Sequence, residues 1–517
     1  MALAAQPLRA QNCAALHHSP PSAAETAYLA GDYAKAVGLY QAALAKSPGD
    51  TDLTAGLVHI LLRQQKVMEA ADALQASIGS SSKSPTLMTL RGEVELREGD
   101  PREAAEAALA SETLYPCNPR TMLLLSRLES LNSQYATAYR LLMSAHKVDP
   151  EDPEIRAAWI RMLPSMQRIA ELETYLASPE GDSPEETQEL QTELTHLKTW
   201  AAGPRKTCTV TSQTASSELP LVSIQNERGT TIAFGLDVRV NGHIVRLAID
   251  TSYNARLPID GVSGLLINES DAKHWKLEPI YQNEVPGVGP QGARAGYVAY
   301  ADSISMGGIE FHNCAVQVMK DNFSNNARGL IGMDVLAQYL VTFDFPKKKL
   351  MLDPLPPRPQ NVAHVNGFYD RTMVPEMKDY IPVYRSGTDV ILPLAVNNKW
   401  PMLFVADTAI PFSALSPEAT SVVRTGHRDA KYEAGGTPKA ENYDFRARNI
   451  EYNFAGLPWT DPTMAGFDTI RFTDDAGTEV SGLMGLRALS RLTVHLDYRD
   501  GLVKFDYDPK RHSPLLF

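Results

Sequence analysis

The chain has 517 residues, of which 44% are hydrophobic and 21% charged, and its formal net charge at pH 7 is −12. This composition excludes a largely disordered or fibrous protein, and the length predicts about three folded units. No dense run of Lys and Arg offsets the acidic balance, so nucleic acid is not an expected partner. No stretch reaches the ~18 apolar residues of a membrane span, so none is predicted.

Residues 1–13 are small and largely apolar but too short for a complete secretory signal. They fit either the end of a signal that starts upstream or a disordered tail. An extracytoplasmic location is slightly favoured, and a cytoplasmic one stays open. The cysteines show no Cys-x-x-Cys pair and no histidine at zinc spacing. We therefore predict buried thiols, with neither a metal site nor a disulfide framework, at Cys13, Cys117, Cys208 and Cys314.

A period of 34 residues runs through the N-terminal third and is marked by Ala36, Ala70, Ala104 and Ala138. Within the first unit, Ala36, Tyr40 and Ala43 share one helical face, so each unit is predicted to be a helix pair. Four such units over about 17–152, with a partial capping pair to about Leu176, resemble the tetratricopeptide repeat family. The resemblance implies an all-α solenoid over 17–177, with a concave face that binds peptides or protein partners. Alternatively, these helices only position the rest of the chain.

Residues 178–218 are polar and rich in Ser and Thr, which predicts a linker with one helix from about Glu185 to Ala202. From about Leu219 the hydrophobic period changes from 3.6 to 2, which predicts strands. The β region contains two similar lobes, at 219–353 and 387–510, joined by a Pro-rich linker over 354–386.

Each lobe contains an apolar strand that ends in an Asp-Thr pair, and an apolar-apolar-Gly segment farther along. The first lobe has Asp250-Thr251-Ser252 and Leu330-Ile331-Gly332; the second has Asp407-Thr408-Ala409 and Leu483-Met484-Gly485. Two such lobes can meet about a pseudo-twofold axis and bring their carboxylates together, where the pair shares one proton. The ionised partner takes a proton from water while the protonated partner donates to a carbonyl, which predicts peptide hydrolysis.

With these motifs, each lobe resembles one subunit of a retropepsin-like aspartic protease, and the tandem resembles a single-chain version of that dimer. The resemblance implies an all-β bilobal module in which Asp250 and Asp407 are catalytic. It also implies that Thr251 and Thr408 hold the two loops together through hydroxyl–backbone bonds. Glycine-rich flaps would close over the substrate at Gly287-Val288-Gly289 and Gly435-Gly436. Water is the nucleophile in this family, so no metal or cofactor is expected, and a monomer suffices for the dyad.

Both catalytic motifs lack the family's glycine, because Ser252 and Ala409 stand in its place. A backbone with positive φ there would be strained by roughly 1 kcal/mol or more, whereas an ordinary φ tolerates either residue. Ser252 could instead supply a hydroxyl to the dyad. The predicted function is an aspartic endopeptidase whose repeats bind a protein substrate or partner. The alternative is an inert protease-like module in a peptide-binding adaptor.

Overall fold

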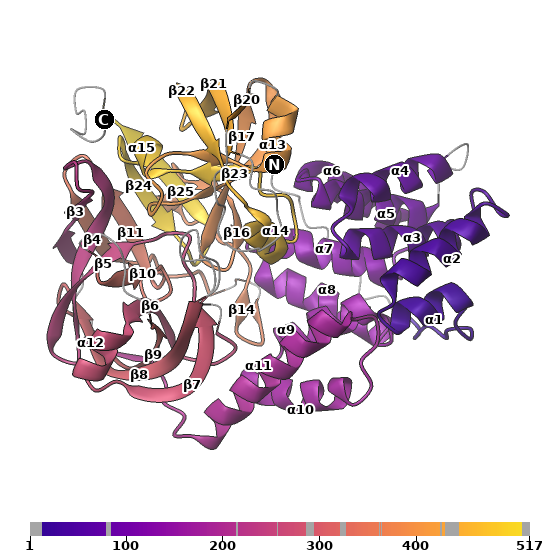
Figure 1. Cartoon of the computed structure of the whole chain (residues 1–517), viewed down its shortest axis with the longest axis horizontal. Helices are drawn as coiled ribbons and strands as arrows, with labels where there is room; N and C mark the ends of the chain where they lie inside the picture. The colour runs from indigo at the N-terminus through magenta and orange to yellow at the C-terminus, as the bar shows by residue number, and fades with distance from the viewer. Residues whose placement is uncertain are drawn as a thin grey trace. The chain divides into compact units, whose positions relative to one another are not determined.

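The computed structural model describes residues 13–508, apart from 79–83, 213–215, 256, 286–293, 321–326, 361, 363, 424–425 and 430–443. The chain divides into two compact units (Figure 1). The first comprises residues up to 130 together with 134–195 and 363–370, and the second comprises 131–133, 196–362 and 371–517.

The helices of the first unit follow one another along the chain, and those up to α8 carry the four units of the 34-residue repeat (Figure 1). They are α1 (Ala23–Leu29), α2 (Tyr33–Leu44), α3 (Thr51–Arg63), α4 (Val67–Ile78), α5 (Pro85–Arg97), α6 (Pro101–Leu114), α7 (Pro119–Leu131), α8 (Tyr135–Val148), α9 (Pro153–Met162), α10 (Ser165–Leu176) and α11 (Pro184–Ala202). The last residues of α11 belong to the second unit.

Two kinds of position recur at this period. The alanines that mark it are all buried, which leaves room for a neighbouring helix. The residue before the first helix of a pair is a cap whose side chain accepts backbone N–H bonds, at Asp50, Ser84, Asn118 and Asp152. The helix pairs predicted from the sequence are therefore confirmed.

The four cysteines form two disulfides, Cys13–Cys117 and Cys208–Cys314. The prediction of free buried thiols is wrong. The partners are 104 and 106 residues apart, so the tertiary fold pairs them and no local spacing signals the bonds. Cys208 immediately precedes β1 (Thr209–Ser212), which pairs antiparallel with the strand that carries Cys314.

A short hairpin from the predicted inter-lobe linker belongs to the unit of the repeats. It consists of β13 (His364–Val365) and β14 (Phe368–Tyr369). The ring of Phe368 stacks on Tyr139 of α8 at a centroid distance of 5.3 Å. Asp370 accepts bonds from the Thr137 backbone N–H at 2.9 Å and from its hydroxyl at 2.8 Å. Because Gln134 makes no side-chain capping bond to α8, Asp370 acts as the cap from a distant part of the chain.

The second unit begins with a nine-stranded sheet in the order β1-β9-β6-β10-β5-β4-β8-β7, with β3 beside β4. Its other elements are β3 (Val222–Gln225), β4 (Thr231–Val240), β5 (His243–Ile249), β6 (Val262–Asn268), α12 (Glu269–His274), β7 (Glu278–Val285), β8 (Arg294–Met306), β9 (Ile309–Met319) and β10 (Gly329–Ile331). Strands β4 and β5 form a hairpin whose turn residues, Asn241 and Gly242, both adopt positive φ, as an Asn-Gly turn requires.

An eight-stranded sheet follows in the order β16-β17-β18-β23-β19-β22-β21-β20. Its elements are β16 (Tyr384–Ser386), β17 (Asp389–Val396), β18 (Lys399–Ala406), β19 (Ala414–Leu415), α13 (Pro417–Val423), β20 (Gly426–Asp429), β21 (Asp444–Phe454), β22 (Leu457–Gly466), α14 (Ile470–Ala476), β23 (Gly482–Met484) and α15 (Leu486–Leu489). It repeats the core of the first sheet: β5 lies parallel to β10, as β18 lies parallel to β23.

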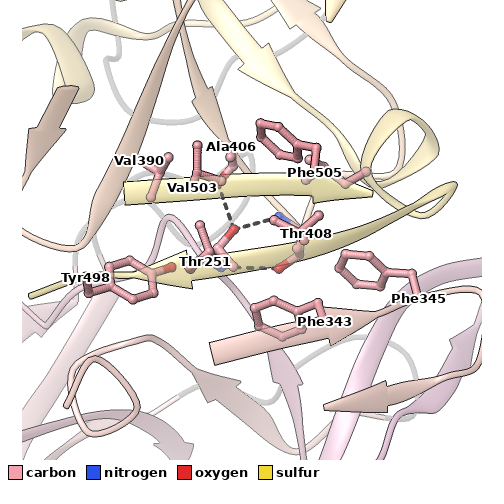
Figure 2. A pocket seen from close by; sticks show the side chains of 12 residues that line it. Thr251, Phe343, Phe345, Val390, Ala406, Thr408, Tyr498, Val503 and Phe505 are labelled. Carbon is pink, nitrogen blue, oxygen red and sulfur yellow. Dashed lines mark hydrogen bonds between the residues drawn. The ribbon is translucent and has the colours of Figure 1, made fainter. Parts of the chain in front are cut away.

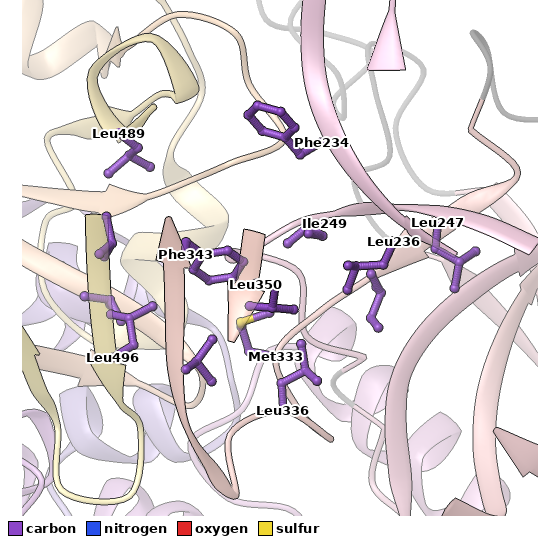
Figure 3. Packing of buried hydrophobic residues seen from close by; sticks show 14 of the residues in the cluster. Phe234, Leu236, Leu247, Ile249, Met333, Leu336, Phe343, Leu350, Leu489 and Leu496 are labelled. Carbon is purple, nitrogen blue, oxygen red and sulfur yellow. The ribbon is translucent and has the colours of Figure 1, made fainter. Parts of the chain in front are cut away.

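A six-stranded sheet in the order β15-β25-β24-β11-β12-β2 joins the two lobes. Its strands are β2 (Ser217–Pro220), β11 (Tyr339–Asp344), β12 (Lys349–Pro354), β15 (Ile381–Pro382), β24 (Leu492–Asp497) and β25 (Leu502–Tyr507), and a short 3-10 helix spans Pro375–Met377. Strands β11 and β24 pair antiparallel, one from each lobe. Figure 3 shows side chains of one buried cluster that both lobes supply, such as Leu247, Phe343, Leu489 and Leu496.

Candidate active site

The two Asp-Thr motifs begin directly after β5 and β18. The backbone N–H of Asp250 donates to Ile331 at 3.0 Å, and that of Asp407 donates to Met484 at 3.0 Å. Each aspartate is thus held against the apolar-apolar-Gly segment of its own lobe. A Cβ at Gly332 would overlap the carbonyl of Tyr253, and this close approach explains why the segment ends in glycine.

The Gly485 segment of the second lobe has the same constraint, because a Cβ there would overlap the backbone of Phe412. The structure therefore places Leu330, Ile331 and Gly332 beside the first loop, and Leu483, Met484 and Gly485 beside the second. The flap residues Gly287, Val288, Gly289, Gly435 and Gly436 lie outside the described residues.

The two catalytic-type loops are joined by reciprocal bonds of their threonines (Figure 2). The Thr251 hydroxyl donates to the carbonyl of Ala406 at 2.7 Å, and the Thr408 hydroxyl donates to that of Ile249 at 2.9 Å. Each hydroxyl also accepts the backbone N–H of the other threonine at 3.2 Å. Since each threonine follows its aspartate, these bonds bring the two aspartate-bearing loops together.

The two carboxyl groups influence each other's protonation. Burial first, and then the negative charge of Asp250, raise the pKa of Asp407 to about 7. Burial also raises the pKa of Asp250, while bonds from Ser252 and the positive charge of Arg471 oppose the shift. Two nearby carboxyls of this kind hold one proton between them over a broad pH range.

The residues that replace the family's glycine sit in ordinary backbone conformations, because neither Ser252 nor Ala409 has a positive φ. Ser252 donates to Asp250 Oδ1 from its backbone at 3.0 Å and from its hydroxyl at 2.9 Å. Its hydroxyl also lowers the pKa of Asp407. The backbone N–H groups of Ala409 and Ile410 donate to Asp407 Oδ1 at 2.7 and 3.3 Å. The added Cβ atoms therefore cause no left-handed strain, and both carboxylates keep their hydrogen-bond donors.

Two charged residues near the loops were missed by sequence reasoning. Arg471 lies on α14, which contacts β16, and its buried Nε has no hydrogen-bond partner among the described residues. The Asp334 carboxyl lies over Gly264, and in the described part of the chain its Oδ2 meets no hydrogen-bond partner. Burial raises the pKa of Asp334 to about 6. Asp334 stands two residues beyond the Gly332 segment, which was the available signal. No sequence pattern connects Arg471 with Asp250.

Behind the threonine bonds lies a small, mainly apolar pocket (Figure 2). Its walls are side chains of the six-stranded sheet and of both loops, including Phe343, Val494 and Phe505. Thr251 and Thr408 are buried beside this pocket, and hydrogen bonds and charge interactions are stronger in such low-dielectric surroundings than in water.

Among the described residues, no group of three or more His, Cys, Asp or Glu side chains is placed to hold a metal ion. In the same part of the chain, no helix is both long and apolar enough to cross a membrane.

Comparisons with known families match both parts of the chain. Residues 27–85 match the tetratricopeptide repeat model, and residues 236–335 match the aspartyl protease model. No curated protein matches the sequence. Among solved structures, the aspartic proteinase from Irpex lacteus overlaps 57% of this chain and 98% of its own, at 10% identity and a TM-score of 0.34. At that similarity the overlap alone assigns no activity.

Proposed function

We propose that this chain, which carries an N-terminal tetratricopeptide repeat and a C-terminal aspartyl protease domain, is an aspartic endopeptidase. The observation that carries the proposal is the set of reciprocal bonds between Thr251 and Thr408. These bonds link two equivalent loops whose aspartates, Asp250 and Asp407, perturb each other's protonation.

In the proposed reaction, Asp250 is the ionised partner and Asp407 the protonated one. The hydroxyl and backbone of Ser252 and the charge of Arg471 stabilise a negative charge on Asp250. Burial and the negative charge of Asp250 raise the pKa of Asp407, which favours its protonated form. Asp250 accepts a proton from the attacking water, and Asp407 donates its proton to the carbonyl oxygen of the scissile peptide. When the C–N bond of the tetrahedral intermediate breaks, Asp250 donates the proton it took from water to the leaving nitrogen. Asp407 takes a proton from a hydroxyl of the intermediate, which restores the starting protonation of the pair.

A peptidase assay tests this proposal. Full-length protein is incubated with a mixed peptide library between pH 3 and pH 8, with and without a statine-type inhibitor. We expect cleavage that the inhibitor blocks and that Asp250→Asn and Asp407→Asn each abolish. Asp237→Asn is the matched control, because Asp237 is exposed on β4 and forms an ion pair with Arg246, away from the two loops. Intact peptides at every pH would refute the proposal and favour the alternative, an inert module in a peptide-binding adaptor.

We also infer that the protein folds in an oxidising, extracytoplasmic compartment. The disulfides Cys13–Cys117 and Cys208–Cys314 support this inference, because such bonds persist outside the reducing cytoplasm. Thiol titration of denatured protein from its native source tests it. We expect the four cysteines to react with a thiol reagent only after the disulfides are reduced. Four reactive thiols before reduction would contradict the inference.

A further inference from the structure

The segment that follows the repeats lies back against their first helices. We call residues 180–186 the acidic segment. The backbone N–H of Gly181 donates to the carbonyl of Leu29 at 2.9 Å, and the hydroxyl of Tyr33 donates to the carbonyl of Gly181 at 2.8 Å. A Cβ at Gly31 would overlap the carbonyl of Asp182, so the backbones approach as closely as glycine allows.

Charge complementarity holds the same segment. Arg63 of α3 forms an ion pair with Asp182 and donates from Nε to Glu186 at 3.2 Å. Glu186 also accepts the Tyr33 hydroxyl at 2.5 Å, and Asp182 accepts the hydroxyl of Tyr175. The side chains of Asp182 and Arg63 are only 4% and 13% exposed. A buried carboxylate that loses its ion-pair partner strongly destabilises the folded state. These contacts therefore determine where the segment lies.

The segment ends as the first turn of α11. Glu186 accepts the backbone N–H of Ser183 at 2.7 Å, and the Ser183 hydroxyl accepts that of Glu186 at 3.2 Å. This is a capping box, so the acidic side chain that contacts Arg63 also stabilises the start of a helix. The repeats therefore recognise a glycine turn followed by an acidic helix start.

These contacts come from first helices of pairs, at Leu29 of α1 and Arg63 of α3, and from second helices, at Tyr33 of α2 and Tyr175 of α10. We call the surface that these residues form the inner face. One position in the first helix of successive pairs is polar, and it recurs every 34 residues at His59, Glu93, Arg127 and Arg161. Arg63 lies one turn beyond His59, on the same side of α3. A Cβ at Gly181 would lie 2.7 Å from Pro153 of α9 and 3.6 Å from Tyr28 of α1. The acidic segment thus reaches both early and late repeats.

We propose that the inner face is a receptor for an acidic, helix-initiating segment, and that residues 180–186 of this chain are its occupant. A partner protein reaches this face only by displacing them. The proposal does not depend on peptidase activity. An inner face that the chain left open would bind a partner protein without competition. The occupied inner face binds a partner only when residues 180–186 leave it.

The test is a competition in the full-length protein. The probe is a fluorescein-labelled peptide with the sequence of residues 178–190, whose binding is followed by fluorescence anisotropy. Asp182→Asn/Glu186→Gln weakens the internal segment and leaves the receptor intact. Glu185→Gln is the matched control, because Glu185 is exposed in the same turn. Hydrogen exchange over residues 180–190 measures whether the segment has been released, and circular dichroism verifies that the helices remain folded.

We expect the double variant to lose amide protection over the segment and to bind the peptide at least tenfold more tightly than wild type. Adding Arg63→Gln to the double variant should abolish that gain. Wild type and Glu185→Gln should bind the peptide weakly and equally. Equal binding by wild type and the double variant would overturn the proposal, and so would unchanged protection in the double variant. A released segment with no gain in peptide binding would also overturn it.

Discussion

Replacing Thr408 with valine preserves the side-chain shape and removes one hydroxyl from the contact between the two loops. That hydroxyl donates to Ile249 at 2.9 Å and accepts from the Thr251 N–H at 3.2 Å. Each buried bond contributes about 1 kcal/mol, and each partner left unsatisfied costs about 1–3 kcal/mol. We therefore expect Thr408→Val to lower the free energy of unfolding by about 2–4 kcal/mol, together with a loss of peptidase activity.

Thr251→Val removes the equivalent hydroxyl, so the two substitutions act on one network. Their effects in a double-mutant cycle should differ from additivity by about 0.5–3 kcal/mol. Urea unfolding followed by near-ultraviolet circular dichroism measures all three variants. Thr113→Val is the control, because its exposed hydroxyl only bonds Leu109 within α6, and a change within about 0.5 kcal/mol is expected. Additive losses, or a Thr408→Val loss as small as the control's, would refute the reasoning.

Three further predictions concern charged residues. Arg471→Met removes a positive charge that lowers the pKa of Asp250, so the acidic limb of the pH–rate profile should move to higher pH; an unmoved limb would contradict this. For Asp334, burial raises the pKa from 3.8 to about 6, so ionisation destabilises the fold as pH rises through that window. Asp334→Asn should therefore stabilise by about 3 kcal/mol at pH 7.5 and much less at pH 4, as measured by urea titration at both pH values. Asp370→Ala removes the cap of α8 and should cost about 1–2 kcal/mol, whereas Thr137→Val, which keeps the backbone N–H bond, should cost less.

Periodic and duplicated features were accessible from the sequence. The alanines at the 34-residue period report local packing within each helix pair, and they are buried as expected. The two Asp-Thr motifs were found because duplication displays the same strand-end pattern twice. Local features such as helix-pair packing and strand-end motifs depend on short stretches of sequence. They can therefore be predicted without knowing which distant residues contact them.

The missed features all depend on contacts between distant segments. The cap that Asp370 supplies to α8 joins residues more than two hundred positions apart, and Arg471 reaches Asp250 from the other lobe. The disulfides also join segments that only the tertiary fold brings together. Strand β1 and the first two residues of β2 lie in the segment 178–218 predicted to be a linker, because each strand is short and pairs with a remote partner. The sequence could not show whether the two loops accept Ser252 and Ala409 without strain, because the answer depends on the φ angles of these residues.

The hairpin of β13 and β14 has a consequence for dissecting the protein into fragments. The chain leaves the protease-like unit, contributes residues 363–370 to the repeats, and returns before the second lobe. A cut between repeats and lobes would therefore strip Phe368 of its stacking partner Tyr139 and deprive α8 of its cap. Neither fragment would be whole, so a single cut cannot separate the repeats from the lobes. Excision should begin by replacing residues 363–370 with a short flexible bridge.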